Sequence, residues 1–189
     1  MQILTHLGYH VIKLPADIDE AIKADETPAC YVQRMAAEKN QTALALFLET
    51  NGAMPDFPLI TADTCVVSDG IILGKPRFQA EAVKFLKLLS GTRHTVLTSV
   101  HIHYRGNAKN CLQTNHVAFK PLSSEEISAY VQSGEPMDKA GAYAVQGIGG
   151  IFIQSIEGSF SGIMGLPVYE TVSMLQDLGY RSPLSALKP

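Results

Sequence analysis

The sequence lacks the features that mark secreted, membrane and duplex-binding proteins. Its 189 residues include three cysteines, an odd number at wide spacings, which argues against a disulfide framework or a zinc cluster. No apolar run reaches the roughly 18 residues of a membrane-spanning helix, and the first residues show no secretory signal. The formal net charge is -3 without runs of like charge, so we expect no nucleic-acid partner. The absence of a disulfide framework and of a signal favours the reducing cytoplasm. A small anionic ligand is still compatible with the net negative charge, because a few well-placed lysines suffice to bind it.

Several catalytic motifs are absent as well. The chain contains no His-Glu-x-x-His, no Gly-x-Ser-x-Gly and no Gly-x-Gly-x-x-Gly opening a helix after a strand. Gly74-Lys75-Pro76 is not a P-loop, because the residue five positions before Gly74 is not glycine and no Ser or Thr follows Lys75. These absences argue against acyl transfer by a serine triad and against dinucleotide binding.

Turn signals divide the chain into helices and strands. Thr27 as N-cap and Pro28 at the first helical position predict a helix that Gly52 ends. Further helices are predicted over residues 79–90, after the capping box at residues 123–126, and after residues 166–167. Strand patterns occupy residues 9–14, 59–67, 71–73, 95–104, 111–119 and 151–156. This order predicts an α/β or α+β fold around a mixed sheet, without a clear linker.

Two charged residues break these patterns. Asp63 interrupts an apolar strand, and burying a carboxylate costs several kcal/mol unless it is paired or bound to a metal. An outward-facing Asp on an edge strand is the competing interpretation. Lys39 lies on the apolar stripe of the long predicted helix, where a lysine can also extend its ammonium to water. If both are functional, they should converge in one cleft.

Three further segments have polar residues in suggestive places. Lys75 follows a strand on a loop stiffened by Pro76. Glu20 belongs to an acidic loop, and such charges are often only a solvated turn. The alternative is that Glu20 faces Asp63 across a cleft, where two carboxylates and bound water can hold Mg²⁺. Residues 138–147 are rich in glycine and alanine, and Gln146 offers an amide suited to a base edge or to water. The competing interpretation is a connection that merely has to turn.

Taken together, these segments resemble the Maf family of nucleoside triphosphate pyrophosphatases. The matching pieces occur in the family's order and spacing over nearly the whole chain. They are Ala36-Ala37-Glu38-Lys39, Thr61-Ala62-Asp63-Thr64, Gly74-Lys75-Pro76, Leu89-Ser90-Gly91-Thr92-Arg93-His94, residues 134–143, Val145-Gln146-Gly147 and Gly165-Leu166-Pro167. The Asp-Lys-Ala-Gly-Ala-Tyr sequence at residues 138–143 resembles the corresponding segment of the branch that acts on dTTP and UTP.

The resemblance implies a fold and an activity. The fold would be Maf/ITPase-like: a single domain over residues 1–189, with a curved mixed sheet flanked by helices and two lobes around a cleft. The enzyme would be a cytoplasmic homodimer that cleaves nucleoside triphosphates between the α- and β-phosphates, releasing the monophosphate and pyrophosphate. Its substrates would be dTTP, UTP and modified pyrimidine triphosphates, with Mg²⁺ or Mn²⁺ as cofactor.

The resemblance also implies residue roles. Asp63 would be the general base, and Glu20 would hold the divalent cation together with Asp63. Lys39 and Lys75 would neutralise the triphosphate. Thr64 and Gln146 would lie where the subfamilies set substrate preference, and Asp138 and Lys139 would also contact the substrate.

One departure from the family pattern concerns the start of the chain. Relatives begin with a strand and a phosphate-binding Ser-x-Ser-Pro-Arg-Arg loop, whereas residues 1–4 resemble the helix that follows that loop. A start codon assigned too late, a fragment and a shortened protein are three competing explanations. We therefore keep two alternatives: a catalytically weak nucleotide-binding or regulatory protein, and an active enzyme with another base preference.

Overall fold

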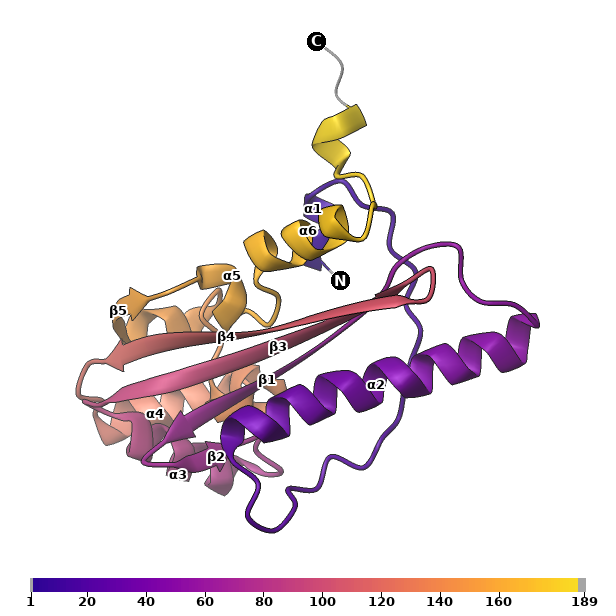
Figure 1. The fold of residues 1–189 in the computed structure, drawn as a ribbon. Coiled ribbons are helices and arrows are strands. Elements are labelled where there is room, and N and C mark those ends of the chain that lie inside the picture. The colour runs from indigo at the N-terminus through magenta and orange to yellow at the C-terminus, as the bar shows by residue number, and fades with distance from the viewer. Residues whose placement is uncertain (1, 187–189) are drawn as a thin grey trace.

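A five-stranded sheet with the order β2-β1-β3-β4-β5 organises the chain, and the computed structural model describes residues 2–186 (Figure 1). The strands are β1 (Leu59–Ser68), β2 (Ile71–Leu73), β3 (Arg93–Tyr104), β4 (Asn107–Phe119) and β5 (Ile153–Glu157). The α-helices are α1 (Gln2–His6), α2 (Pro28–Asn51), α3 (Gln79–Leu89), α4 (Ser124–Gln132), α5 (Phe160–Ile163) and α6 (Val168–Asp177). Short 3₁₀ turns are η1 (Glu135–Asp138), η2 (Ala140–Ala142), η3 (Ile148–Phe152) and η4 (Pro183–Ala186).

The predicted class of a sheet flanked by helices is confirmed, but the expected mixture of strand directions is wrong. Every strand pair within residues 2–186 is antiparallel. Asp69-Gly70 joins β1 to β2 and Arg105-Gly106 joins β3 to β4, with positive φ at all four residues. Two-residue turns of this kind connect only antiparallel neighbours, because two parallel strands need a crossover connection of a dozen or more residues.

The strand expected at residues 9–14 is also not formed. This stretch has no regular secondary structure and pairs with no strand in the described part of the chain. Ile12 is 67% exposed, so the alternating pattern buries no continuous face. Tyr9 stacks instead on Tyr180, with ring centroids 6.4 Å apart. An alternating pattern yields a strand only where a neighbouring strand supplies hydrogen-bond partners.

Helix α2 begins and ends as its sequence predicts and covers one face of the sheet (Figure 1). The Thr27 hydroxyl accepts a hydrogen bond from the Cys30 amide, and Gly52 ends the helix in the left-handed conformation. Buried side chains of α2 include Val32, Met35, Ala36 and Ala43. The buried Asn40 amide donates to the carbonyls of Leu59 and His101, which ties α2 to β1 and β3.

The opposite face of the sheet carries two hydrophobic clusters. One joins β1, β3 and β4 to α3, α4 and the turns that follow α4, and the other joins Val100 and Ile102 to α6. Because side chains alternate along a strand, odd-numbered residues of β1 such as Asp63 face α2 and even-numbered ones such as Thr64 face these clusters.

The glycine-rich segment is held directly against β1. The Gly141 amide donates a 3.0 Å hydrogen bond to the Gly74 carbonyl. Gly141 has a φ of +68°, and a Cβ atom there would lie 2.7 Å from the Val66 side chain. Only glycine satisfies both the backbone conformation and the close contact. This packing brings residues 138–146 to the edge of the sheet that carries Asp63.

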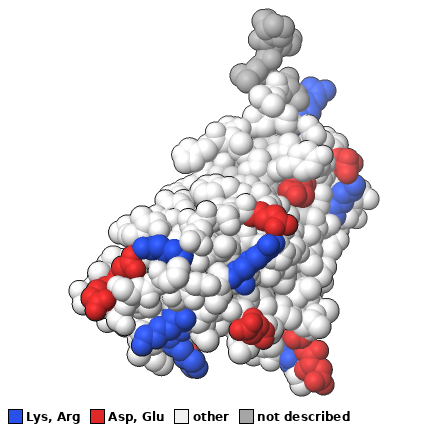
Figure 2. Space-filling view, turned by 90° about the vertical axis from the view of Figure 1, so that its left-hand side faces the viewer, with Lys and Arg blue, Asp and Glu red and all other residues white. Residues whose placement is uncertain are grey.

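Two surface properties bear on partners. Within residues 2–186, no helix combines the length and the apolar character needed to cross a bilayer. On the face drawn in Figure 2, basic side chains are interleaved with acidic ones and separated by neutral surface. That face therefore offers no continuous basic stripe of the kind that binds a nucleic-acid backbone.

Candidate active site

A cleft with a cavity volume of about 350 Å³ opens beside β1. The residues that the sequence singles out gather there: Lys39, Asp63, Thr64, Lys75, Asp138, Lys139 and Gln146 all line it. Glu20 reaches the same place through its contact with Lys39. The structure thus brings together residues from α2, β1, the loop after β2 and the glycine-rich segment.

The cleft extends around a free edge of β1. Residues 59–65 pair with β3 on one side, whereas β2 pairs only from Val66 onward. Within the described chain the other edge of residues 59–65 is therefore open. Asp63 and Thr64 point to opposite faces of the sheet, yet both line the cleft because it passes around this edge. The α2 face supplies Lys39 and Asp63, and the opposite face supplies Thr64.

The charged part of the site is a carboxylate–ammonium–carboxylate arrangement. The Lys39 Nζ atom lies 2.7 Å from Asp63 Oδ1 and 2.7 Å from Glu20 Oε1. The side chains of Asp63 and Lys39 are 14% and 21% exposed. One ammonium therefore serves two carboxylates, which leaves the group with a net negative charge suited to a cation.

The pKa values of these groups reflect burial and mutual hydrogen bonding. Burial raises the pKa of Asp63 above its ordinary value, although the hydrogen bond from Lys39 opposes the shift. Burial also disfavours the Lys39 ammonium, but its hydrogen bonds to Asp63 and Glu20 outweigh that effect and raise its pKa. The hydrogen bond from Lys39 lowers the pKa of Glu20, and the charge of Lys75 contributes. A carboxylate with a raised pKa is the stronger base.

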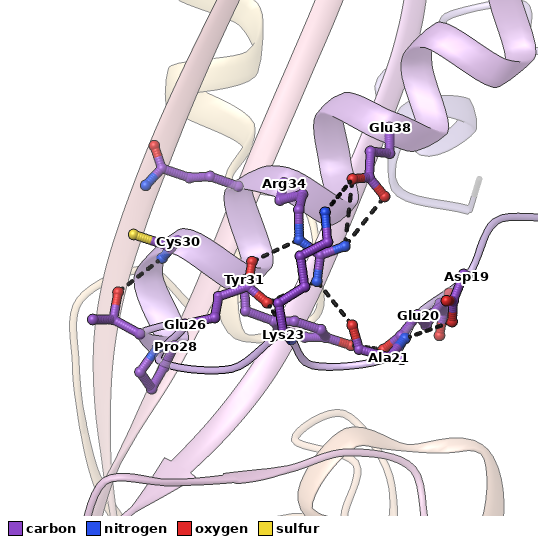
Figure 3. A network of polar contacts seen from close by, with 12 residues as sticks. Asp19, Glu20, Ala21, Lys23, Glu26, Pro28, Cys30, Tyr31, Arg34 and Glu38 are labelled. Atoms are coloured by element: carbon purple, nitrogen blue, oxygen red, sulfur yellow. Dashed lines mark hydrogen bonds and ion pairs between the residues drawn. The ribbon is translucent and has the colours of Figure 1, made fainter.

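Arg34 fixes the loop that carries Glu20 (Figure 3). Its guanidinium pairs with both carboxylate oxygens of Glu26, at 2.6 and 2.7 Å, and donates to the Ala21 carbonyl at 2.9 Å. It also reaches Glu38 on the next turn of α2 at 3.2 Å. The Tyr31 hydroxyl donates to the Glu20 carbonyl at 3.2 Å. Bidentate contacts of this kind set geometry as well as energy, so the loop has a fixed position against α2.

The glycine-rich side of the cleft is fixed by a residue that sequence reasoning missed. The Glu135 carboxylate accepts hydrogen bonds from the amides of Ile148 and Gly149 and from the Tyr130 hydroxyl. These bonds hold the backbone just after Gly147, and the Ala144 amide donates to the same Tyr130 hydroxyl at 3.2 Å, so the backbone is held on both sides of Gln146. The sequence gives no hint of this, since Glu135 resembles any acidic residue after a helix.

Asp138 and Lys139 stand at the mouth of the cleft. They pair with each other, and Asp138 is mostly exposed. The hydrogen bond from Lys139 lowers the pKa of Asp138. Gln146 is exposed and also lines the cleft, so its amide can reach an incoming ligand.

A buried histidine supports the floor of the cleft. His94 Nε2 lies 2.9 Å from the hydroxyl of Tyr143, which lines the cleft. The imidazole also packs edge-on against Phe119, with centroids 5.0 Å apart. Burial lowers the pKa of His94 to about 4, so the ring is neutral at physiological pH.

Asp63 and Glu20 are the carboxylates of the cleft that a divalent cation could use. Within residues 2–186, no three His, Cys, Asp or Glu side chains are grouped so as to hold a metal by themselves. Asp63 and Glu20 nevertheless converge on one point, where Lys39 lies between them. Mg²⁺ commonly uses one or two carboxylates together with waters and substrate phosphates. The residues present therefore fit a cation that arrives with a phosphate ligand.

Comparisons with known proteins agree with this geometry. A family model described as "Maf-like protein" matches residues 1–178. A dTTP/UTP pyrophosphatase of Neisseria meningitidis serogroup B is 83% identical over 189 residues, covering 100% of this chain and 94% of the relative. A nucleoside triphosphate pyrophosphatase of Haemophilus ducreyi is 47% identical over 174 residues, covering 92% and 87%. A dTTP/UTP pyrophosphatase of Pasteurella multocida is 45% identical over 180 residues, covering 94% and 90%.

Proposed function

This chain belongs to the Maf-like protein family, and we propose that it hydrolyses dTTP and UTP to the nucleoside monophosphate and pyrophosphate. The observation that carries the proposal is the contact of Lys39 with Asp63 in a cleft that Lys75 also lines. A triphosphate brings several negative charges, and two ammonium groups offset much of that charge. Phosphoryl and nucleotidyl transfer depends mainly on positioning and on such charge neutralisation.

The proposed chemical step uses Asp63 as general base. Its carboxylate takes a proton from a water molecule while the water oxygen bonds to the α-phosphorus. The bond between the α-phosphorus and the bridging oxygen then breaks, and pyrophosphate leaves with that oxygen. Asp63 suits this role because burial raises its pKa while Lys39 keeps the carboxylate ionised and oriented.

Asp63 and Glu20 are the residues that would hold Mg²⁺ or Mn²⁺. When bound, such a cation neutralises phosphate charge and lowers the pKa of water. Lys39 keeps the two carboxylates close together, and the Arg34 contacts keep the Glu20 loop against α2. These residues thereby preserve the spacing of the donor set before substrate arrives.

The neutral half of the cleft suits the nucleobase. Thr64, Gln146 and Gly165 line it opposite the charged cluster, and none of them carries a charge. An amide and a hydroxyl can recognise a pyrimidine edge by hydrogen bonds. We therefore place the base beside Thr64 and Gln146, with Asp138 and Lys139 at the mouth of the cleft.

A cytoplasmic location and a homodimeric state complete the proposal. Both follow from the family resemblance, and the free thiols of Cys30, Cys65 and Cys111 agree with a reducing compartment. Light scattering of the purified protein tests the dimer directly.

Pyrophosphate release from a panel of triphosphates tests the activity. Purified protein with Mg²⁺ or Mn²⁺ should turn over dTTP and UTP with a higher kcat/KM than CTP, GTP or ATP. Tight binding of dTTP without pyrophosphate release would instead favour a nucleotide-binding or regulatory role. A higher kcat/KM for a purine triphosphate would favour another base preference.

A further inference from the structure

Thr98 lies beside Thr64 on the neighbouring strand, and it is not among the residues that line the cleft. It occupies the position on β3 directly opposite Thr64 in the antiparallel register, and it is 0% exposed. Its Oγ1 atom is 2.9 Å from Thr64 Oγ1 and 2.7 Å from the Gly162 carbonyl oxygen. Thr98 thus links a residue of the cleft to the backbone of α5.

The direction of these two hydrogen bonds follows from the number of protons available. A carbonyl oxygen only accepts, so the single hydroxyl proton of Thr98 is donated to Gly162. Thr98 Oγ1 must then accept in its contact with Thr64, which makes Thr64 the donor. The hydroxyl proton of Thr64 is therefore directed into the protein. Thr64 Oγ1 can therefore offer only its lone pairs to a ligand in the cleft, which makes it a hydrogen-bond acceptor.

The packing of α5 keeps the Gly162 carbonyl in place. A Cβ atom at Gly162 would lie 1.8 Å from Gln113 Oε1, so a larger residue there would displace the Gln113 side chain. The Gly162 amide donates to the Ser159 hydroxyl at 3.1 Å, and Gln113 accepts from Asn115 at 2.9 Å. The Ser159 amide donates in turn to Asn115 Oδ1 on β4, so hydrogen bonds hold the segment that carries the Gly162 carbonyl against the sheet.

The backbone at residue 165 leaves Thr64 accessible. A Cβ atom at Gly165 would lie 3.3 Å from Thr64 Oγ1, and Gly165 has a φ of +105°. A side chain there would crowd the Thr64 oxygen. Because glycine occupies the position, no side chain of residue 165 covers this oxygen, and Thr64 lines the cleft.

We propose that Thr98 is a positioning residue that makes Thr64 a hydrogen-bond acceptor only, so that the cleft selects a pyrimidine whose ring nitrogen N3 carries a hydrogen. Uracil and thymine donate from N3, whereas N3 of cytosine is an acceptor that meets the lone pairs of Thr64. The inference rests on the proposed function and names how its base preference arises. Two acceptors facing each other in a cleft remain unsatisfied, and this penalty disfavours cytosine.

The decisive measurement is the ratio of kcat/KM for UTP to that for CTP. Thr98→Val removes the acceptor for the Thr64 proton, so the Thr64 hydroxyl can rotate and donate to cytosine; the ratio should fall about tenfold. Thr98→Ser keeps a hydroxyl and should restore the ratio. Thr171→Val is the matched control, because Thr171 is also 0% exposed but lies on α6 outside the cleft, and it should leave the ratio unchanged.

A double-mutant cycle tests whether Thr98 acts through Thr64. Thr64→Val alone should lower the kcat/KM for UTP about tenfold and affect CTP little. Adding Thr98→Val to it should change the ratio no further. A ratio unaffected by Thr98→Val, or an additional loss in the double variant, overturns the inference.

The test also separates this inference from the proposed function. A wild-type protein that releases pyrophosphate from neither UTP nor dTTP overturns the proposed function. Affinities of the Asp63→Asn variant for UTP and CTP then decide the role of Thr98 without turnover. Here too, Thr98→Val should reduce the preference for UTP, and an unchanged affinity ratio contradicts the inference.

Discussion

The Lys39 ammonium donates a 2.7 Å hydrogen bond to the Asp63 carboxylate across the gap between α2 and β1. Neither residue suits its place by the rules of folding alone, since one is a charge on an apolar helical stripe and the other a charge within a largely apolar strand. Each makes the burial of the other tolerable, because a paired and hydrogen-bonded charge costs far less than an isolated one. Both side chains also line the cleft.

Arg34 should control the affinity for the divalent cation through the position of Glu20. Arg34→Gln removes the bidentate contact with Glu26 and the bond to the Ala21 carbonyl, so the loop loses its fixed place. We expect the Mn²⁺ concentration for half-maximal activity to rise by roughly 10- to 100-fold, as for residues that support metal ligands elsewhere.

Arg93→Gln provides the control for this experiment. Arg93 pairs with Glu157 on the surface, far along the chain from the Glu20 loop. Its loss should leave the Mn²⁺ dependence unchanged. If chelation of divalent cations leaves the wild-type rate intact, the metal role of Glu20 and Asp63 is wrong.

The pH dependence of stability should reveal His94. Its folded-state pKa of about 4 lies below the ordinary 6.5, so the unfolded chain binds the proton first as pH falls. Stability is therefore fully present above pH 6.5 and declines as pH falls toward 4, by roughly 3 kcal/mol. Urea unfolding at several pH values measures the slope.

A substitution isolates the histidine from other acid-sensitive groups. His94→Gln should remove most of this decline, because no titrating ring remains between Phe119 and Tyr143. Substitution of the exposed His6 by Gln should retain the wild-type profile. Identical profiles for wild type and His94→Gln would show that acid destabilisation has another source.

Gly141 should be needed both for its close contact with Val66 and for its left-handed backbone conformation. Gly141→Ala places a Cβ atom 2.7 Å from Val66 at a φ of +68°. The strained backbone and the overlap together should cost about 2–4 kcal/mol and lower activity, because the segment behind Lys139 and Tyr143 must shift.

Gly70→Ala separates the two causes. Gly70 has a similar φ of +77°, but nothing lies within 4 Å of its added Cβ. Gly70→Ala should lower the free energy of unfolding by only about 1–2 kcal/mol, because it strains the left-handed backbone without creating an overlap. Equal losses of unfolding free energy in the two variants would contradict the packing role of Gly141.

Local signals in the sequence predict much of the fold. Thr27, Pro28 and Gly52 define helix α2 because capping depends on nearby residues, and Asp63 and Lys39 stand out because each violates a local pattern. The direction of the strands and the absence of a strand at residues 9–14 depend on which neighbours are present, and no local pattern contains that information. Thr98 and Glu135 escape notice for the same reason.

Within the site, the sequence finds the charged residues better than the neutral ones. A buried charge is unusual wherever it occurs, whereas a threonine in a strand is ordinary. The importance of Thr98 comes from its register opposite Thr64 and its contact with Gly162, which are properties of the assembled sheet. Glu135 matters because a loop distant in sequence donates to it.

The central claim is that Asp63 activates water while Lys39 and Lys75 hold the triphosphate, and pyrophosphate release by Asp63→Asn tests it most directly. The amide keeps the shape of the side chain but cannot take a proton, so kcat for dTTP should fall by about 10²–10⁴ while the thermal midpoint changes little. Asp56→Asn, an exposed substitution shortly before β1, should retain the wild-type kcat. A folded Asp63→Asn protein that releases pyrophosphate at the wild-type rate would contradict the account.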